Sequence, residues 1–191
     1  MNTKMQLRAV RDLVWRDMPR KEYHNPLHAD DVSQTAGRFA RLIGMDEELV
    51  HLEETAGLIH DIIHVGGASD NEEQSAMYGR LYLPRLGYKQ WEVDVMADMI
   101  VGGTKIPQNP RSVLDMILAD ADVYNAGRDD FLLRNDLLRK ELGLPENRAW
   151  YESSLKFLEN VNWWTEPARH YGEPVRQQNI EQLSKMLKQA A

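Results

Sequence analysis

Histidine is concentrated in one part of the chain, and imidazole is the side chain that most often binds metal ions or carries protons near neutral pH. Five of the six histidines fall between positions 24 and 64, and four of these, His24, His28, His60 and His64, are candidates for a functional site. Two of these four stand in polar clusters, Tyr23-His24-Asn25 and His60-Asp61, and the other two are His28 and His64. Such crowding is unusual for a protein without a special use for imidazole, and it indicates a functional site.

The local sequence predicts where these histidines lie on helices. Asn25 followed by Pro26 is typical of a helix N-cap with proline at the first helical position. His28 would then lie on the first turn of this helix, whereas His24 precedes the cap and is free to point elsewhere. The two side chains need not serve the same role.

The doublet His60-Asp61 lies near the end of another predicted helix, where adjacent residues diverge by about 100° around the axis. Both side chains can contact one ion only if it lies over the seam between them, so a second helix must supply further ligands. One candidate is the helix that carries His28. The other is the segment 118–122, which offers Asp120 and Asp122.

Two imidazoles and two carboxylates form a mixed nitrogen and oxygen ligand set that suits Mn, Fe, Co, Ni, Zn or Mg. A metal so held lowers the pKa of bound water and polarises a phosphoryl oxygen, which makes phosphate-ester hydrolysis the natural chemistry. The chain has no cysteine, so any metal must bind His, Asp or Glu. We expect one or two divalent ions per chain.

The motifs resemble the H…HD…D signature of the HD superfamily of metal-dependent phosphohydrolases, with His28, the doublet His60-Asp61 and a later Asp in LADADVYNAG. The strings YHNPLHADDVSQ at 23–34 and LIHDIIH at 58–64 are similar to motifs of cyclic-nucleotide phosphodiesterases, a branch of that superfamily. The string NEEQSA from Asn71 and the segment 169–183 resemble small bacterial predicted HD phosphohydrolases. The similarity to the family motifs is strong over residues 23–76, moderate near 118–127 and weak in the rest of the chain.

The resemblance implies roles for individual residues. His28, His60, Asp61 and one aspartate near 122 would bind the first ion, with Asp61 bridging to a second ion held mostly by water. For that aspartate we prefer Asp122 over Asp120, because Asp122 precedes an asparagine by three residues as the family aspartate does.

The resemblance also implies the catalytic residues. His24 would match the phosphodiesterase histidine that protonates the leaving oxygen, and His64 the one beside the metal-bound hydroxide. Together with Asp61, these are the catalytic residues that we predict.

Three residues are candidates for binding the substrate. Glu72 could contact metal-bound water or a second ion, although 70–73 is also a favourable, acidic helix start. Asn71 belongs to the same string. Arg169 could reach a phosphate beside the aromatic run Trp163-Trp164, which could stack a base, close a core or form a dimer contact. The glutamine and aromatic clamp that hold a purine in phosphodiesterases cannot be located, so we do not predict cyclic-nucleotide specificity.

These side chains must be positioned by helices. Apolar residues recur at spacings of three and four throughout, as in Val32, Ala36, Phe39, Ala40 and Ile43, and no segment alternates with a period of two. We therefore predict an all-α fold of about eight or nine helices. Turn residues at 65–69, 101–110 and 143–147 separate helical segments, and Asn109-Pro110 predicts a further helix start.

Size and charge restrict the class of protein. The 191 residues suit one domain, residues 1–191. The net charge of −7 and the lack of a dense run of Lys and Arg argue against DNA or RNA as the partner. A small anionic substrate remains compatible, because a bound cation reverses the local field. No apolar run approaches the roughly 18 residues of a membrane-spanning helix, so we expect a cytoplasmic protein and leave a homodimer open.

The sequence thus predicts metal-dependent hydrolysis of a small phosphate mono- or diester by attack of a metal-bound hydroxide on phosphorus. Among such esters, a nucleotide is the substrate that we favour. Two alternatives stay open. One is a regulatory module that binds metal and nucleotide without turnover. The other is an HD-type di-iron oxygenase, which is disfavoured because His170 is the only histidine after His64.

Overall fold

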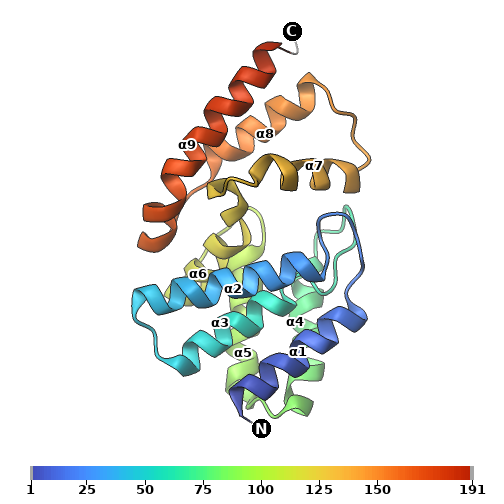
Figure 1. Cartoon of the computed structure of the whole chain (residues 1–191). Coiled ribbons are helices and arrows are strands. Elements are labelled where there is room, and N and C mark those ends of the chain that lie inside the picture. The colour runs from blue at the N-terminus through green and yellow to red at the C-terminus, as the bar shows by residue number, and fades with distance from the viewer. Residues whose placement is uncertain (1, 190–191) are drawn as a thin grey trace.

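The computed structural model describes residues 2–189, in which all regular structure is helical (Figure 1). The α-helices are α1 (Thr3–Asp17), α2 (Pro26–Ile43), α3 (Glu47–Ile59), α4 (Asn71–Tyr82), α5 (Gln90–Met99), α6 (Val113–Asp122), α7 (Phe131–Glu141), α8 (Arg148–Asn160) and α9 (Glu166–Gln189). Three short helical turns are η1 (Leu83–Leu86), η2 (Ile100–Thr104) and η3 (Tyr124–Gly127). The predicted all-α fold is confirmed for these residues. The predicted domain also includes residues 1, 190 and 191, which lie outside the described residues.

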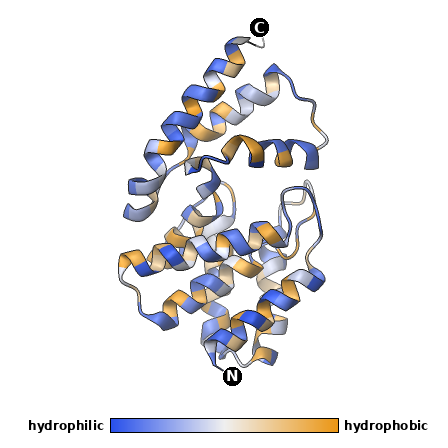
Figure 2. Cartoon of the chain, in the orientation of Figure 1, coloured by the Kyte–Doolittle hydropathy of each residue, from blue (hydrophilic) through white to orange (hydrophobic). Residues whose placement is uncertain are grey.

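The helices are arranged in two groups (Figure 1). Helices α1 to α5 lie toward the end of the molecule that holds the N-terminus, α7 to α9 lie toward the other end, and α6 leads from one group to the other. Apolar and polar residues alternate along most helices in Figure 2, as amphipathic helices require. The apolar faces meet in a buried core that includes Phe39, Leu58, Met96, Leu118 and Leu158.

Helices α2 and α3 pack unusually closely, because Gly57 of α3 faces the backbone of Ser33 in α2. A Cβ atom at position 57 would lie 2.7 Å from the Ser33 Cα atom, inside any real carbon contact. The Ser33 hydroxyl also donates a hydrogen bond of 2.7 Å to the Glu54 carbonyl. This close pair matters for the site, since α2 carries His28 and His60 directly follows α3.

The predicted start of α2 is confirmed. The Asn25 side chain accepts hydrogen bonds from the backbone N–H groups of Leu27 at 2.9 Å and His28 at 3.2 Å, and Pro26 takes the first helical position. The cap therefore fixes the direction of the first turn, on which His28 lies.

The predicted helix start at Asn109-Pro110 is wrong, because α6 begins three residues later, at Val113. The Ser112 hydroxyl accepts a 3.0 Å hydrogen bond from the Asp115 N–H, and the Asp115 carboxylate accepts one of 3.2 Å from the Ser112 N–H. This reciprocal capping box satisfies two backbone donors and places the helix start at Val113 rather than at Pro110.

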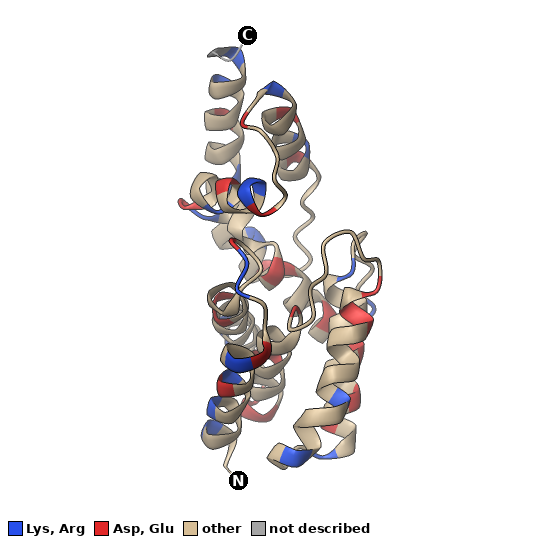
Figure 3. Ribbon diagram, turned by 90° about the vertical axis from the view of Figure 1, so that its right-hand side faces the viewer, with Lys and Arg blue, Asp and Glu red and all other residues tan. Residues whose placement is uncertain are grey.

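Charged side chains of both signs are interspersed along the helices in the view of Figure 3. Many form ion pairs, such as Arg128 with Asp31 at 2.5 Å. None of the helices within residues 2–189 has both the length and the apolar character needed to cross a bilayer.

Glu53 of α3 is fully buried, and neither of its carboxylate oxygens has a hydrogen-bond partner among the described residues. Burial, with a smaller contribution from Asp115, raises the pKa of Glu53 well above its ordinary value. A raised pKa in the folded state means that ionising this group opposes folding. At a pH below about 4.5, the pKa of Glu53 in the unfolded chain, ionisation costs the fold no stability. The loss of stability grows as the pH rises and is complete once the pH exceeds the raised pKa of Glu53 in the folded protein.

We expect Glu53→Gln to increase the free energy of unfolding at pH 7 to 8, with a gain that shrinks steadily toward pH 4, because glutamine cannot ionise. Urea denaturation across this pH range measures the effect. The exposed Glu159→Gln is the matched control and should show no such trend. A gain that is independent of pH would contradict this account of Glu53.

We expect Gly57→Ala to destabilise the fold. The new Cβ atom meets Ser33 backbone, which cannot rotate away, so the strain should exceed the gain of about 1 kcal/mol that Ala has over Gly inside a helix. The net loss in the free energy of unfolding should be about 1–3 kcal/mol, measured by thermal or urea denaturation. Gly66→Ala, where no atom lies within 4 Å, is the control and should be nearly neutral.

Candidate metal centre

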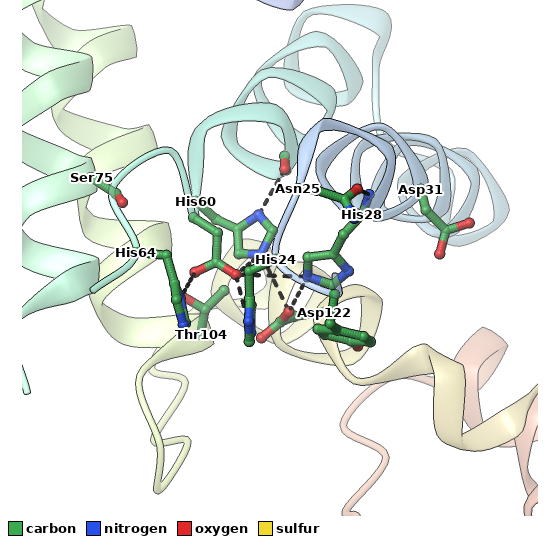
Figure 4. A network of polar contacts seen from close by, with 12 residues as sticks. His24, Asn25, His28, Asp31, His60, His64, Ser75, Thr104 and Asp122 are labelled. Atoms are coloured by element: carbon green, nitrogen blue, oxygen red, sulfur yellow. Dashed lines mark hydrogen bonds and ion pairs between the residues drawn. The ribbon is translucent and has the colours of Figure 1, made fainter. Parts of the chain in front are cut away.

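Three helices bring four of the predicted site residues together (Figure 4). His28 comes from the first turn of α2, His60 and Asp61 directly follow α3, and Asp122 is the last residue of α6. The Asp122 Oδ1 atom lies 3.5 Å from His28 Nε2 and 3.3 Å from His60 Nε2. The Asp61 Oδ2 atom lies 3.7 Å and 3.3 Å from the same two nitrogens. His28, His60 and Asp122 offer atoms within 4.8 Å of one another, as ligands of one metal ion must.

The imidazole nitrogens that face the carboxylates fit a cation. His60 donates from Nδ1 to the Gly57 carbonyl at 2.8 Å, which leaves Nε2 to act as a ligand. The Nε2 atoms of both His28 and His60 are buried, and neither has a hydrogen-bond partner within residues 2–189. Buried polar atoms are rarely left without a partner, so a bound ion would account for both.

The charges of the site favour the same interpretation. Although burial opposes it, His60 and His64 hold the pKa of Asp61 well below its usual range, and His28 and His60 lower the pKa of Asp122. Burial likewise acts to lower the pKa of His60, but the two carboxylates outweigh it and raise that pKa. Both carboxylates are therefore held ionised by the positive charge of the imidazoles, and a divalent ion bound between them would take over that charge while the imidazoles lose their protons.

The two candidate aspartates of α6 have separate environments. Asp122 faces His28 and His60, whereas the Asp120 carboxylate accepts the backbone N–H groups of Trp164 at 2.9 Å and Thr165 at 2.7 Å. Asp120 is fully buried, and burial raises its pKa to about 6 despite these bonds. Asp120 thus anchors the chain just before α9. The role of Asp122 as a metal ligand stays a prediction.

A second cluster borders the first. The His24 and His64 rings stack with their centroids 3.6 Å apart and their planes 15° apart. His24 Nδ1 lies 2.7 Å from Glu141 Oε1, while His24 Nε2 faces Asp61 Oδ2 at 3.9 Å. His64 Nδ1 lies 3.7 Å from Asp61 Oδ1. His24, His64 and Glu141 also offer atoms close enough to share an ion.

Glu141 is the residue of this cluster that sequence reasoning missed. It is the last residue of α7, and its Oε2 atom accepts the backbone N–H groups of Tyr23 at 2.9 Å and His24 at 2.8 Å. Burial lowers the pKa of His24, and the Glu141 carboxylate acts against that shift. In the sequence, Glu141 follows Arg139 and Lys140 at a helix end, where it is indistinguishable from a surface residue.

A pocket of about 390 Å³ opens beside these clusters, and we call it the metal pocket. Its lining includes His24, Asp61, His64, Asn71, Glu72 and Asp122. The Asn71 side chain accepts the Val65 N–H at 2.8 Å and donates to the Val65 carbonyl at 3.1 Å, so it holds the loop after His64 in place. Glu72 faces the pocket.

Arg169 does not line the metal pocket, unlike the other predicted substrate-binding residues. It is exposed, and its guanidinium donates a 3.0 Å hydrogen bond to the Trp163 carbonyl. We therefore leave it out of the proposed site. The two remaining histidines also lie elsewhere: buried His51 stacks on Tyr88, and His170 is exposed on α9.

Comparisons with known proteins give a family and a fold. Among curated proteins, none matches this chain significantly. Bacillus subtilis YpgQ in complex with ADP is 22% identical and has a TM-score of 0.73, with 97% of this chain and 96% of that chain covered. YpgQ alone is 21% identical, with a TM-score of 0.74 and 98% of both chains covered. A predicted HD superfamily hydrolase from an uncultured Thermotogales bacterium is 22% identical, with a TM-score of 0.67 and 100% of both chains covered.

These solved structures show a shared fold. The family model described as HD domain matches residues 28–127, which span His28, the His60-Asp61 doublet and Asp122. The match confirms the family that the motifs predicted. Since it covers more than half of the sequence, the chain belongs to the HD domain family.

Proposed function

We propose that this protein is a metal-dependent phosphohydrolase that acts on a small phosphate ester, specifically a nucleotide. One observation carries the proposal: two buried imidazole nitrogens without partners among the described residues face two carboxylates that are held ionised. Membership of the HD domain family supports the same reaction class. That a protein of the same fold, YpgQ, has been solved in complex with ADP supports a nucleotide.

His28, His60, Asp61 and Asp122 would hold the ion, which their nitrogen and oxygen donors restrict to Mn, Fe, Co, Ni, Zn or Mg. A divalent ion bound there lowers the pKa of a coordinated water and polarises a phosphoryl oxygen. The protein itself orients the ligands. The Gly57 carbonyl fixes the tautomer of His60, and the Asn25 cap fixes the turn that carries His28.

His24 is the proposed proton donor to the leaving oxygen. Its Nδ1–H donates to Glu141, so the Nε2 atom is directed toward Asp61 and the metal pocket. The Glu141 carboxylate favours the protonated imidazole, which burial alone disfavours. His64 supports this ring by stacking on it. General acid catalysis of this kind contributes about 10²- to 10⁴-fold to a rate.

We expect Asp122→Asn to lose the metal and to keep its fold, because Asp122 is a proposed ligand. Asp120→Asn is the matched control two residues away. It should keep the metal but lose about 1–3 kcal/mol of stability, since one buried N–H group before α9 then lacks an acceptor. Elemental analysis of protein purified without chelator, and equilibrium dialysis against Mn²⁺, measure the metal. Loss of metal from Asp120→Asn alone would reverse the assignment.

We expect His24→Ala to lower kcat about 10²- to 10⁴-fold for a nucleotide with full metal content. The loss should be far smaller for p-nitrophenyl phosphate, whose leaving group needs no proton. Glu141→Gln should also lower kcat more for the nucleotide than for p-nitrophenyl phosphate, but by a smaller factor, because Glu141 acts through His24. Steady-state kinetics with both substrates, alongside metal analysis, test this. Loss of metal from His24→Ala would instead make His24 a ligand.

A further inference from the structure

Two further hollows lie beside the metal pocket. We call the first the inner cleft, of about 290 Å³, and the second the outer cleft, of about 490 Å³. His24, Ile106 and Asp122 line both the metal pocket and the inner cleft. Ile106, Val123, Ser153 and Phe157 line both clefts. The three hollows therefore adjoin one another between the proposed metal ligands and α8.

The chemistry of the lining changes along this path. The metal pocket is lined by Lys105 and by the imidazoles and carboxylates described above. Among the described residues that line the inner cleft, only His24 and Asp122, which it shares with the metal pocket, are ionisable near neutral pH. Beyond them, apolar and aromatic side chains such as Val123, Phe131 and Trp150 share the wall with amides and hydroxyls. The charged part of a ligand thus belongs in the metal pocket, and an uncharged part that carries hydrogen-bonding groups belongs in the inner cleft, whereas the outer cleft adds the charge of Lys156.

Asn125 is the amide that points to a ligand. Its Oδ1 atom is buried and has no hydrogen-bond partner within residues 2–189, although Asn125 lines the inner cleft. The other amides nearby are already used. Asn135 pairs with Ser154, and Gln108 binds the Ala119 carbonyl and the Trp164 indole N–H. A turn of the Asn125 side chain toward the inner cleft would therefore offer this acceptor to a donor group of a bound molecule.

Phe157 supplies an aromatic surface at the junction of the two clefts. Its side chain remains 37% exposed, although it lies near-parallel to buried Phe131 with a centroid distance of 6.4 Å. An aromatic ring exposed on a cleft wall suits stacking against a flat heterocycle. A sugar phosphate without a base would leave this surface without a partner.

We propose that the inner cleft binds the nucleoside of a nucleotide, with its base stacked on Phe157 and a donor group bonded to Asn125, while its phosphate lies in the metal pocket. This inference rests on the proposed function and adds the subsite that distinguishes nucleotides from other phosphate esters. The carbonyl and amino groups of a base, and the hydroxyls of its sugar, match the amide and hydroxyl lining of the cleft.

The test uses the Mn²⁺-loaded protein, the four common 5′-nucleoside monophosphates and ribose 5-phosphate, which lacks a base. We expect kcat/KM for at least one nucleotide to exceed that for ribose 5-phosphate at least tenfold. Phe157→Ala should lower kcat/KM for that nucleotide about tenfold and leave ribose 5-phosphate unchanged. Trp91→Ala, which removes an aromatic side chain of similar exposure on α5, is the control and should change neither.

Asn125→Leu separates recognition from folding. It should weaken nucleotide binding about tenfold without lowering Tm, because it removes a buried acceptor that has no partner within residues 2–189. If the wild type hydrolyses ribose 5-phosphate as well as any nucleotide, or if neither variant affects nucleotides, the inference is wrong and the proposed function stands. If no phosphate ester is hydrolysed, the proposed function fails. Calorimetric titration with the same compounds then tests the inference separately. Binding that is lost without the base and weakened by Phe157→Ala supports the inference, and binding that depends on neither contradicts it.

Discussion

Two carboxylates, Asp61 and Asp122, share one largely buried space, and their mutual repulsion has to be offset for the surrounding helices to pack. Both lie within 3.7 Å of the Nε2 atoms of His28 and His60. The four side chains come from α2, α6 and the residues that follow α3, so the charge balance at this point links three helices. A cation at their centre would serve stability and chemistry alike, because it replaces repulsion with attraction to both carboxylates.

The C-terminal helices complete this arrangement from the other side. Glu141, at the end of α7, binds His24 and the backbone that leads into α2, while Asp120 of α6 holds the residues just before α9. Asp120 and Asp122 lie about 200° apart around the axis of α6. One end of a single helix can therefore anchor the C-terminal helices with one carboxylate and turn the other toward the histidines.

Much of this could be predicted from the sequence because it is encoded locally. Apolar spacing predicts the helices, Asn25-Pro26 predicts the turn that carries His28, and the doublet His60-Asp61 lies in a motif that identifies the family. The choice between Asp120 and Asp122 could not be derived from spacing alone, since it depends on which side of α6 the histidines approach. Local sequence can also mislead. Asn109-Pro110 and Ser112 both predict a helix start, and α6 begins after the capping box of Ser112.

The residues that sequence reasoning missed act across long separations. Glu141 lies 117 positions after His24 in the sequence, and their hydrogen bond depends on how α7 packs. A local sequence pattern cannot predict such packing. The clefts beside the metal pocket likewise combine Asn125 of η3, Phe157 of α8 and the loop at Ile106. Arg169 is a candidate for a phosphate contact because it is a basic residue close to two tryptophans; in the structure its guanidinium donates to the Trp163 carbonyl before α9, and its predicted role stays a prediction.

The contact between Gly57 and Ser33 has a consequence for which metals the protein can discriminate. With no side chain between the two backbones, α2 and α3 cannot slide apart or together without disrupting their contact, so the spacing of the donors on His28 and His60 is set by the main chain. Helices packed this closely would resist a change in that spacing when an ion binds. Ionic radius and preferred coordination geometry, rather than the intrinsic strength of the donors, would then be the properties by which the proposed centre selects its metal.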